Sequence, residues 1–163
     1  MTNITEHQTG EGKLYMCCVK DVFSNRIVGY SIASRMKSRL TVDALNNAVA
    51  MRGDVSGCIV HSDRGSQFPI EEIPEGSRPS SSRRIDGQGR VLFGQRRHGV
   101  PFFSLVQKNV LNRRVWTTRE QLRIALVTWI EGPYHRRRTQ THLDRLTPIE
   151  YETIMIPAAI TTA

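Results

Sequence analysis

Two strand-like segments joined by a short turn constrain the fold of this chain more than any other feature of its sequence. Residues 13–22 are largely apolar and include tyrosine and valine, and residues 26–33 alternate apolar and polar side chains. Phe23-Ser24-Asn25 lies between them and has the composition of a tight turn. We therefore predict that the two segments form an antiparallel β-hairpin.

A helix and a further strand are predicted directly after the hairpin. Residues 40–51 place their apolar side chains on one helical face, and Gly53 is a typical helix end. Residues 57–61 form a short apolar run that leads into Asp63. The order of elements is therefore strand, strand, helix and strand, which indicates an α/β chain.

Three more helices are predicted toward the C-terminus. Residues 102–111 place apolar side chains near one face. Residues 117–130 open with the capping box TTRE and should end at Gly132-Pro133. A second capping box, TPIE at residues 147–150, has proline at the first helical position. We expect the chain to fray beyond Pro157.

Residues 69–101 differ in composition from the rest of the chain. They are rich in glycine and proline, contain Ser80-Ser81-Ser82, and show neither a helical nor a strand period. A connection of about 30 residues without secondary structure is uncommon inside a compact domain. The segment is therefore expected to be irregular, either as a disordered insertion or as a stretch whose sequence no longer fits the fold around it.

The composition favours a cytosolic protein that binds a polyanion. The formal net charge of +8 and the pI near 10 favour nucleic acid as the partner over a merely basic soluble protein. No apolar run approaches the roughly 20 residues that span a membrane, and the N-terminus lacks a secretory signal. Cys17, Cys18 and Cys58 lack CxxC spacing, which favours buried free thiols over a metal site.

Asp63, in the run IVHSDRGSQF, is the candidate catalytic residue. An apolar, strand-like stretch delivers its carboxylate to a small turn that contains Gly65, where a metal-dependent phosphoryl-transfer site requires an acid. One carboxylate does not form such a site, so its partners decide the function. Ser62 and Ser66 beside His61 lack a nucleophile elbow, which argues against nucleophilic catalysis.

Four motifs along the chain carry a family resemblance: LYMCCVKDVFSNRIVGYSI, IVHSDRGSQF, FFSLVQKNVL and TPIEYE. Together they resemble the integrase-core domain of insertion-sequence transposases, which are related to retroviral integrases. The resemblance covers residues 1–68 and 102–152. It implies a ribonuclease-H-like α/β fold, with a mixed sheet that contains an antiparallel hairpin and is flanked by helices. A single domain would span residues 1–152, followed by a tail at 153–163.

The resemblance implies a site in which three acids hold two divalent metal ions, Mg²⁺ or Mn²⁺. The two metals activate the attacking oxygen of a phosphodiester reaction and neutralise the leaving oxygen. Asp63 matches the second acid and would be a metal ligand. Asn3, in the run TNIT, stands at the first-acid position with a neutral carbonyl, and Gly99 and Val100 stand where the third acid is expected. With one of three acids, we expect poor metal binding and no catalysis.

Two parts of the aberrant segment become similar to the family when their codons are read one nucleotide later. Codons can be chosen for PIEEIPEGSR that then spell RSRKFLRAL, which continues the second motif. Codons for IDGQGRVLFGQRRHGVP can likewise spell SMGRVGSCSDNAAMES, which approaches the third acid. We therefore predict that residues 69–101 are a frameshifted stretch of a transposase gene. We also expect the chain to be truncated, because full-length members carry helical DNA-binding regions upstream of the first acid.

Basic residues are the candidate DNA contacts. The family carries a Tyr-Asn-x-x-Arg stretch where this chain has Tyr134, with His135 in place of the asparagine. Phosphate contact independent of sequence is one interpretation of these residues, and a solvated charged face is the other. The predicted contacts are Lys108, Arg113, Arg114, Arg136, Arg137 and Arg138.

The histidines offer weaker candidates. His61 and His142 are possible metal ligands by residue type, but structural or DNA-backbone roles fit them better. For His7, His98 and His135 we expect surface positions without a specific partner.

The expected function is DNA transposition and integration, through metal-dependent strand cleavage and transfer, with this copy catalytically defective. DNA, as transposon ends and target, is the expected partner, and an intact transposase is a second candidate. The alternatives are a non-catalytic nucleic-acid-binding remnant that interferes with an intact transposase, and a product that never folds stably. We expect no membrane association and a location in the bacterial cytoplasm with the nucleoid.

Overall fold

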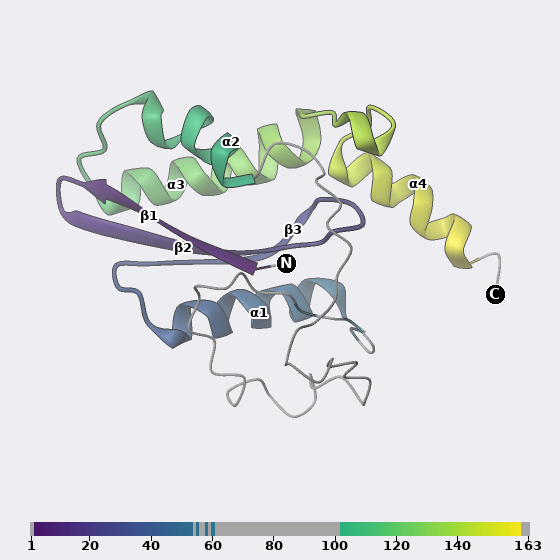
Figure 1. Ribbon diagram of the computed structural model, residues 1–163, viewed down its shortest axis with the longest axis horizontal. Coiled ribbons are helices and arrows are strands. Elements are labelled where there is room, and N and C mark those ends of the chain that lie inside the picture. The colour runs from purple at the N-terminus through teal and green to yellow at the C-terminus, as the bar shows by residue number, and fades with distance from the viewer. Residues whose placement is uncertain (1, 54, 56–57, 59, 61–101, 161–163) are drawn as a thin grey trace, which may run out of the picture.

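A three-stranded sheet with helices on both faces forms the body of the molecule (Figure 1). The computed structural model describes residues 2–53, 55, 58, 60 and 102–160. Strands β1 (Thr2–Thr9), β2 (Gly12–Lys20) and β3 (Ile27–Ala33) are antiparallel neighbours in that order. The predicted hairpin is β2–β3, and it is confirmed. The antiparallel sheet with helices is compatible with the predicted α/β class.

The other regular elements of the described chain are helical. They are α1 (Ser38–Arg52), α2 (Phe102–Asn109), the 3₁₀ turn η3 (Leu111–Arg113), α3 (Arg119–Trp129), the π-helix η4 (Ile130–Arg137), the 3₁₀ turn η5 (Thr141–Leu143) and α4 (Pro148–Ile160). Helix α1 covers one face of the sheet, and α2 and α3 cover the other (Figure 1). No helix in the described part of the chain is both long and apolar enough to cross a membrane.

Strand β2 contributes to the core on both faces because successive side chains point to opposite sides of a strand. Leu14, Met16 and Cys18 are buried under α2 and α3. Cys17 and Val19 are buried under α1. The predicted burial of free thiols is thus confirmed for Cys17 and Cys18, and burial raises the pKa of the Cys17 thiol to about 11.

The strand predicted at residues 57–61 lies largely outside the described residues. Cys58 and Val60 are described, and both are exposed and outside the strands. Burial of Cys58 was therefore predicted wrongly. Its amide donates to the nearby Val55 carbonyl at 3.0 Å, a local turn contact instead of a strand pairing.

Helix α1 ends where the sequence predicts. Gly53 adopts φ 70°, a left-handed conformation that favours glycine, and its amide donates to the Val49 carbonyl at 2.9 Å. Gly29 on β3 lets α1 approach closely, since a Cβ there would lie 2.3 Å from the Ala44 carbonyl oxygen. This contact fixes the distance between α1 and the sheet.

Helix α3 begins one residue later than its predicted capping box implied. Thr118 is the N-cap, and its hydroxyl accepts from the Gln121 amide at 3.2 Å. The carboxylate of Glu11, in the β1–β2 turn, accepts from the Arg119 amide at 2.9 Å. A contact from a distant turn therefore satisfies a second amide of the first helical turn, which a local pattern does not reveal.

Gly132-Pro133 does not end the helical segment, contrary to prediction. The chain continues from α3 into η4, whose wide turns tolerate Pro133, and the Arg138 amide closes it on the Pro133 carbonyl at 2.8 Å. Tyr134 and His135 are buried in this stretch. Their tertiary contacts, described below, account for a helix that local propensity opposes.

Helix α4 begins with the predicted capping box. The Thr147 amide donates to the Glu150 carboxylate at 2.8 Å, and the Glu150 amide donates to the Thr147 hydroxyl at 3.3 Å. The helix runs across residues 152 and 153, where a tail was predicted to begin. It also continues past Pro157 to Ile160, so the expected fraying is not seen there.

Candidate functional site

Of the three predicted acid positions, the structure describes the first, which Asn3 occupies. It lies on β1 opposite Cys18 of β2 and is half-buried. Its side-chain oxygen accepts from the adjacent Ile4 amide at 2.8 Å. The neutral oxygen at the predicted first-acid position is therefore already engaged by the backbone. Asp63, Gly99, Val100 and the motif residue His61 lie outside the described residues.

Strand register places Asn3 at one end of the sheet. Asn3 pairs with Cys18, which pairs with Tyr30 of β3. The turn between β2 and β3 lies at this same end. We call it the Asn3 end.

The start of α2 reaches the Asn3 end through two aromatic residues. The Tyr134 hydroxyl donates to the Asn25 carbonyl, in the β2–β3 turn, at 2.8 Å. Phe102, the first residue of α2, packs edge-on against Tyr134 with ring centroids 5.0 Å apart. Phe102 closely follows the expected third-acid position, and these two contacts place the start of α2 near the β2–β3 turn.

The last turn of α1 is tied to the same end. Arg52 donates to the Asp21 carboxylate, directly after β2, at 2.7 Å. The chain leaves α1 here toward the segment that contains Asp63. The end of α1 and the start of α2 therefore lie toward the same end of the sheet as Asn3.

A buried carboxylate joins α4 to the β2–β3 turn and to the end of α1. Glu152 of α4 is 5 % exposed and accepts from the Ser24 hydroxyl at 2.6 Å and from Arg26 at 2.7 Å, as well as from Arg52. Burial alone would raise the pKa of Glu152, but the hydrogen bonds from these three partners outweigh it and lower that pKa. Glu152 is the last residue of the family-like motif TPIEYE, and its position indicates a structural role.

His135 is the second residue whose role the sequence did not reveal. It was expected at the surface, but it is fully buried, and its Nε2 accepts from the Ile27 amide of β3 at 3.1 Å. Its Nδ1 faces the Glu131 carboxylate at 3.3 Å. Burial lowers the pKa of His135 despite the opposing effect of Glu131. The lowered pKa favours the neutral ring, which the hydrogen bond from the Ile27 amide requires.

The predicted basic residues fall into two groups. Arg136, Arg137 and Arg138 are exposed and directly follow Tyr134 and His135, which are anchored at the Asn3 end. The other group comprises Lys108, Arg113 and Arg114, which are also exposed.

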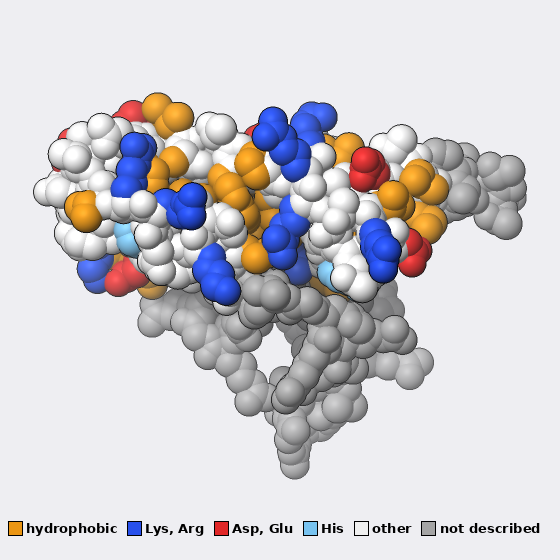
Figure 2. Space-filling view, turned by 90° about the horizontal axis from the view of Figure 1, so that it is seen from above, with side chains coloured by type: hydrophobic (Ala, Val, Ile, Leu, Met, Phe, Trp, Pro, Cys, Tyr) orange, Lys and Arg blue, Asp and Glu red, His pale blue; other side chains and the backbone are white. Residues whose placement is uncertain are grey.

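Arg113 and Arg114 lie toward the opposite end of the sheet. The Trp116 carbonyl accepts from the Gly10 amide, in the β1–β2 turn, at 2.9 Å. The Arg114 guanidinium lies over the Trp116 ring, 4.2 Å from its centroid. Figure 2 shows Lys and Arg side chains spread over this face of the molecule and interspersed with apolar ones.

The described residues contain no cluster of three or more His, Cys, Asp or Glu side chains that could hold a metal ion. His142, a candidate ligand by residue type, has its ring Nε2 against the Asn25 side-chain amide. Among the described residues, Asn3 is the one predicted to lie at the expected Mg²⁺ or Mn²⁺ site. Its neutral amide is a weaker ligand for a hard divalent cation than a carboxylate.

Comparisons with known proteins agree with the family resemblance that the sequence motifs indicate. The family model of the integrase core domain matches residues 1–73. The transposase for insertion sequence element IS904 of Lactococcus lactis is 28 % identical over 155 residues, which cover 92 % of this chain and 59 % of the relative. That for IS629 of Shigella sonnei is 28 % identical over 156 residues, 93 % of this chain and 50 % of the relative.

Transposase InsF for IS3A of Escherichia coli (strain K12) is 27 % identical over 150 residues, which cover 92 % of this chain and 52 % of the relative. The chain thus spans about half the length of the curated relatives it matches. No solved structure matches it.

Proposed function

We propose that this chain, which is similar to insertion-sequence transposases and matches the integrase core domain over residues 1–73, derives from the DNA transposition machinery and is catalytically defective. The observation that carries the proposal is Asn3 on β1, where the family places its first acid. A neutral amide there removes one anionic ligand from a two-metal site. The absence of a carboxylate at Gly99 and Val100 removes a second one.

Strand-transfer assays on the ends of the parent element, with Mg²⁺ or Mn²⁺, test this proposal. We expect no product above the level of the Asp63→Ala variant, because a single carboxylate holds a metal pair poorly. Product formation that requires Asp63 would overturn the proposed defect. A related intact transposase assayed on the same DNA ends controls for the quality of the substrate.

A second candidate function is DNA binding without cleavage. It is supported by the exposed run Arg136, Arg137 and Arg138 next to the Asn3 end and by the net charge of +8. We propose that Lys108, Arg113 and Arg114 extend the DNA-binding surface along α2 and η3. An intact transposase is a possible second partner, with which such a remnant would compete for transposon ends and target DNA in the bacterial nucleoid.

Duplex DNA binding at several salt concentrations tests the second candidate. Replacing Arg136, Arg137 and Arg138 with alanine should lower the salt slope by up to about 0.9 for each phosphate that the variant no longer neutralises. The matched control is the triple alanine variant of Arg35, Lys37 and Arg39, which are also exposed. Equal decreases in both variants would mean that net charge alone drives binding.

We further propose that the complete fold is ribonuclease-H-like, as the similarity to the integrase core domain implies. We also propose that residues 69–101 arose by a frameshift. The nucleotide sequence of the gene tests that origin directly, because the frame one nucleotide later must encode the family motif. A gene whose shifted frame encodes something else rules the frameshift out.

A further inference from the structure

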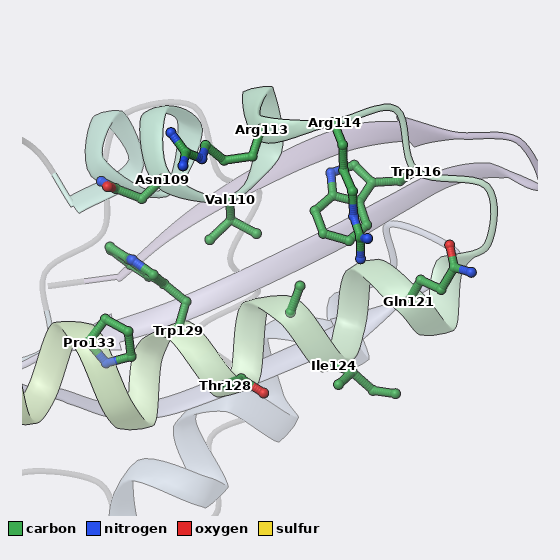
Figure 3. A pocket seen from close by; sticks show the side chains of 11 residues that line it. Asn109, Val110, Arg113, Arg114, Trp116, Gln121, Ile124, Thr128, Trp129 and Pro133 are labelled. Carbon is green, nitrogen blue, oxygen red and sulfur yellow. The ribbon is translucent and has the colours of Figure 1, made fainter.

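A groove between α2–η3 and α3 has apolar walls that the proposed function does not explain. Its volume is about 400 Å³, and residues from both walls face each other across it (Figure 3). Val110 and Trp116 line one wall, and Ile124, Ala125 and Trp129 line the other. Trp129 connects this groove to the Asn3 end, because its ring centroid lies 6.1 Å from that of Phe102 and 5.5 Å from that of Tyr134.

The floor and one wall of the groove are apolar and partly uncovered. Ile124 is 58 % exposed although it faces the groove from the middle of α3. Ala125 and Trp129, which line the groove beside it, are half-buried. Exposed apolar side chains gathered around a concavity are typical of interaction sites, whereas single ones scattered over a surface need no explanation.

The charges at the groove have one sign. Arg113 and Arg114 line it, and none of its lining residues is acidic. Arg114 lies over the Trp116 ring, and the Trp116 Nε1 donates to the Leu111 carbonyl at 3.1 Å. The Arg114 guanidinium is therefore held in place before any partner arrives, which reduces the entropy cost when a carboxylate binds to it.

We infer that this groove binds an acidic, amphipathic segment of a partner protein. Apolar side chains of the segment pack on Ile124 and Trp129, and its carboxylates pair with Arg113 and Arg114. A helix laid in a groove between two helices is a common mode of such recognition. The charge complementarity favours an acidic partner, and the net charge of +8 steers it toward the chain.

Duplex DNA fits this groove less well than a peptide. Phosphates match the two guanidiniums, but they do not cover an apolar floor lined by isoleucine and tryptophan. A second copy of this strongly basic chain is disfavoured by charge repulsion. Both remain outcomes of the experiment, and binding of the peptide does not depend on whether the chain also binds DNA.

The probe is a synthetic helical peptide of about 14 residues, four helical turns, with leucines at i, i+3, i+4 and i+7 and glutamates elsewhere. Binding is measured by fluorescence anisotropy without DNA. Ile124→Ser and the pair Arg113→Gln and Arg114→Gln should each weaken binding at least tenfold. A peptide with serine for leucine, and one with lysine for glutamate, should bind at least tenfold more weakly than the probe.

Matched controls separate the groove from general effects. Ile154→Ser changes an isoleucine that is 54 % exposed on α4, outside the groove, and should alter binding less than twofold. The pair Arg136→Gln and Arg137→Gln removes the same charge elsewhere and should also have less than a twofold effect. Thermal unfolding of Ile124→Ser should match that of Ile154→Ser, which excludes loss of fold as the cause.

Three results would overturn the inference. The first is an equal decrease of peptide binding in Ile124→Ser and Ile154→Ser. The second is self-association, detected by light scattering, that Ile124→Ser abolishes. The third is duplex DNA binding that Ile124→Ser weakens while the acidic peptide fails to bind, which would assign the groove to nucleic acid.

Discussion

The carboxylate of Glu152 in α4 forms an ion pair at 2.7 Å with the guanidinium of Arg26, which lies 126 residues earlier in the sequence. Arg52 at the end of α1 contacts the same carboxylate. One buried acid thus joins the last helix, the β2–β3 turn and α1. Loss of its charge should loosen the Asn3 end of the sheet.

Glu152→Gln should lower the free energy of unfolding by about 2 kcal/mol, because it removes charged hydrogen bonds while keeping the shape of the side chain. Urea unfolding with an unchanged m-value is the measurement. Glu120→Gln is the control, since Glu120 forms only an exposed pair with Arg123 at 3.5 Å and should change stability by less than about 0.5 kcal/mol.

The effect of Glu152→Gln should depend on pH. The folded state lowers the pKa of Glu152, so its stabilisation is complete above the unfolded value of 4.5 and disappears as the pH falls through the folded pKa. Stability curves of the wild type and the variant should therefore converge in acid. A difference that persists undiminished in acid would show that the charge is not its cause.

His135 should make folding sensitive to pH on the acid side of 6.5. Its folded pKa lies below this ordinary value, so its contribution is complete above 6.5 and disappears as the pH falls through the folded pKa. His135→Asn keeps a side-chain acceptor for the Ile27 amide but cannot titrate. Below pH 6.5 the slope of stability against pH should decrease by up to about 1.4 kcal/mol per pH unit in the variant. Urea unfolding at a series of pH values above and below 6.5 is the measurement. An unchanged slope would assign the titration to another group.

Asn3→Asp tests the missing first acid without relying on catalysis. The Asn3 side-chain oxygen accepts from the Ile4 amide, and a carboxylate oxygen can do the same, so the fold should tolerate the change. We expect Mn²⁺ to raise the Tm of Asn3→Asp more than that of the wild type, because binding to the folded state stabilises it. Adding Asp63→Ala should abolish the gain. A gain that survives this change would place the metal elsewhere.

Gly29→Ala should be among the most destabilising single-methyl additions in the described chain. The new Cβ would lie 2.3 Å from the Ala44 carbonyl oxygen and 2.6 Å from the Ala48 nitrogen, both backbone atoms that cannot move independently. We expect the free energy of unfolding to fall by about 3 kcal/mol in chemical unfolding. Gly132→Ala is the matched control, because nothing lies within 4 Å of its new Cβ, and it should be neutral or stabilising by up to about 1 kcal/mol.

Much of this fold could be predicted from local patterns in the sequence. The β2–β3 hairpin follows from apolar segments on either side of a turn, and Gly53 ends α1 because glycine adopts positive φ easily. The capping box at Thr147 depends on residues three apart, so the sequence specifies it directly. The predicted acid positions followed from family resemblance, and Asn3 could be recognised as a departure without coordinates.

Other features depend on contacts between distant residues. Strand β1 has the polar sequence TNITEHQT, and its pairing with β2 defines it. Glu11 helps α3 begin, and the Tyr134 and His135 contacts with the β2–β3 turn and β3 support a helix through Gly132-Pro133.

The resemblance to the family, the hairpin and the lack of carboxylates at two predicted acid positions could be read from the sequence by itself, because motifs and short-range periodicity encode them. Only the tertiary structure showed that His135 is buried and that Glu152 links three elements. It also separated Arg136, Arg137 and Arg138 from the arginines of the α2–α3 groove. The physical reason is that burial and electrostatic pairing are set by neighbours in space, which here lie 100 or more residues apart in the chain.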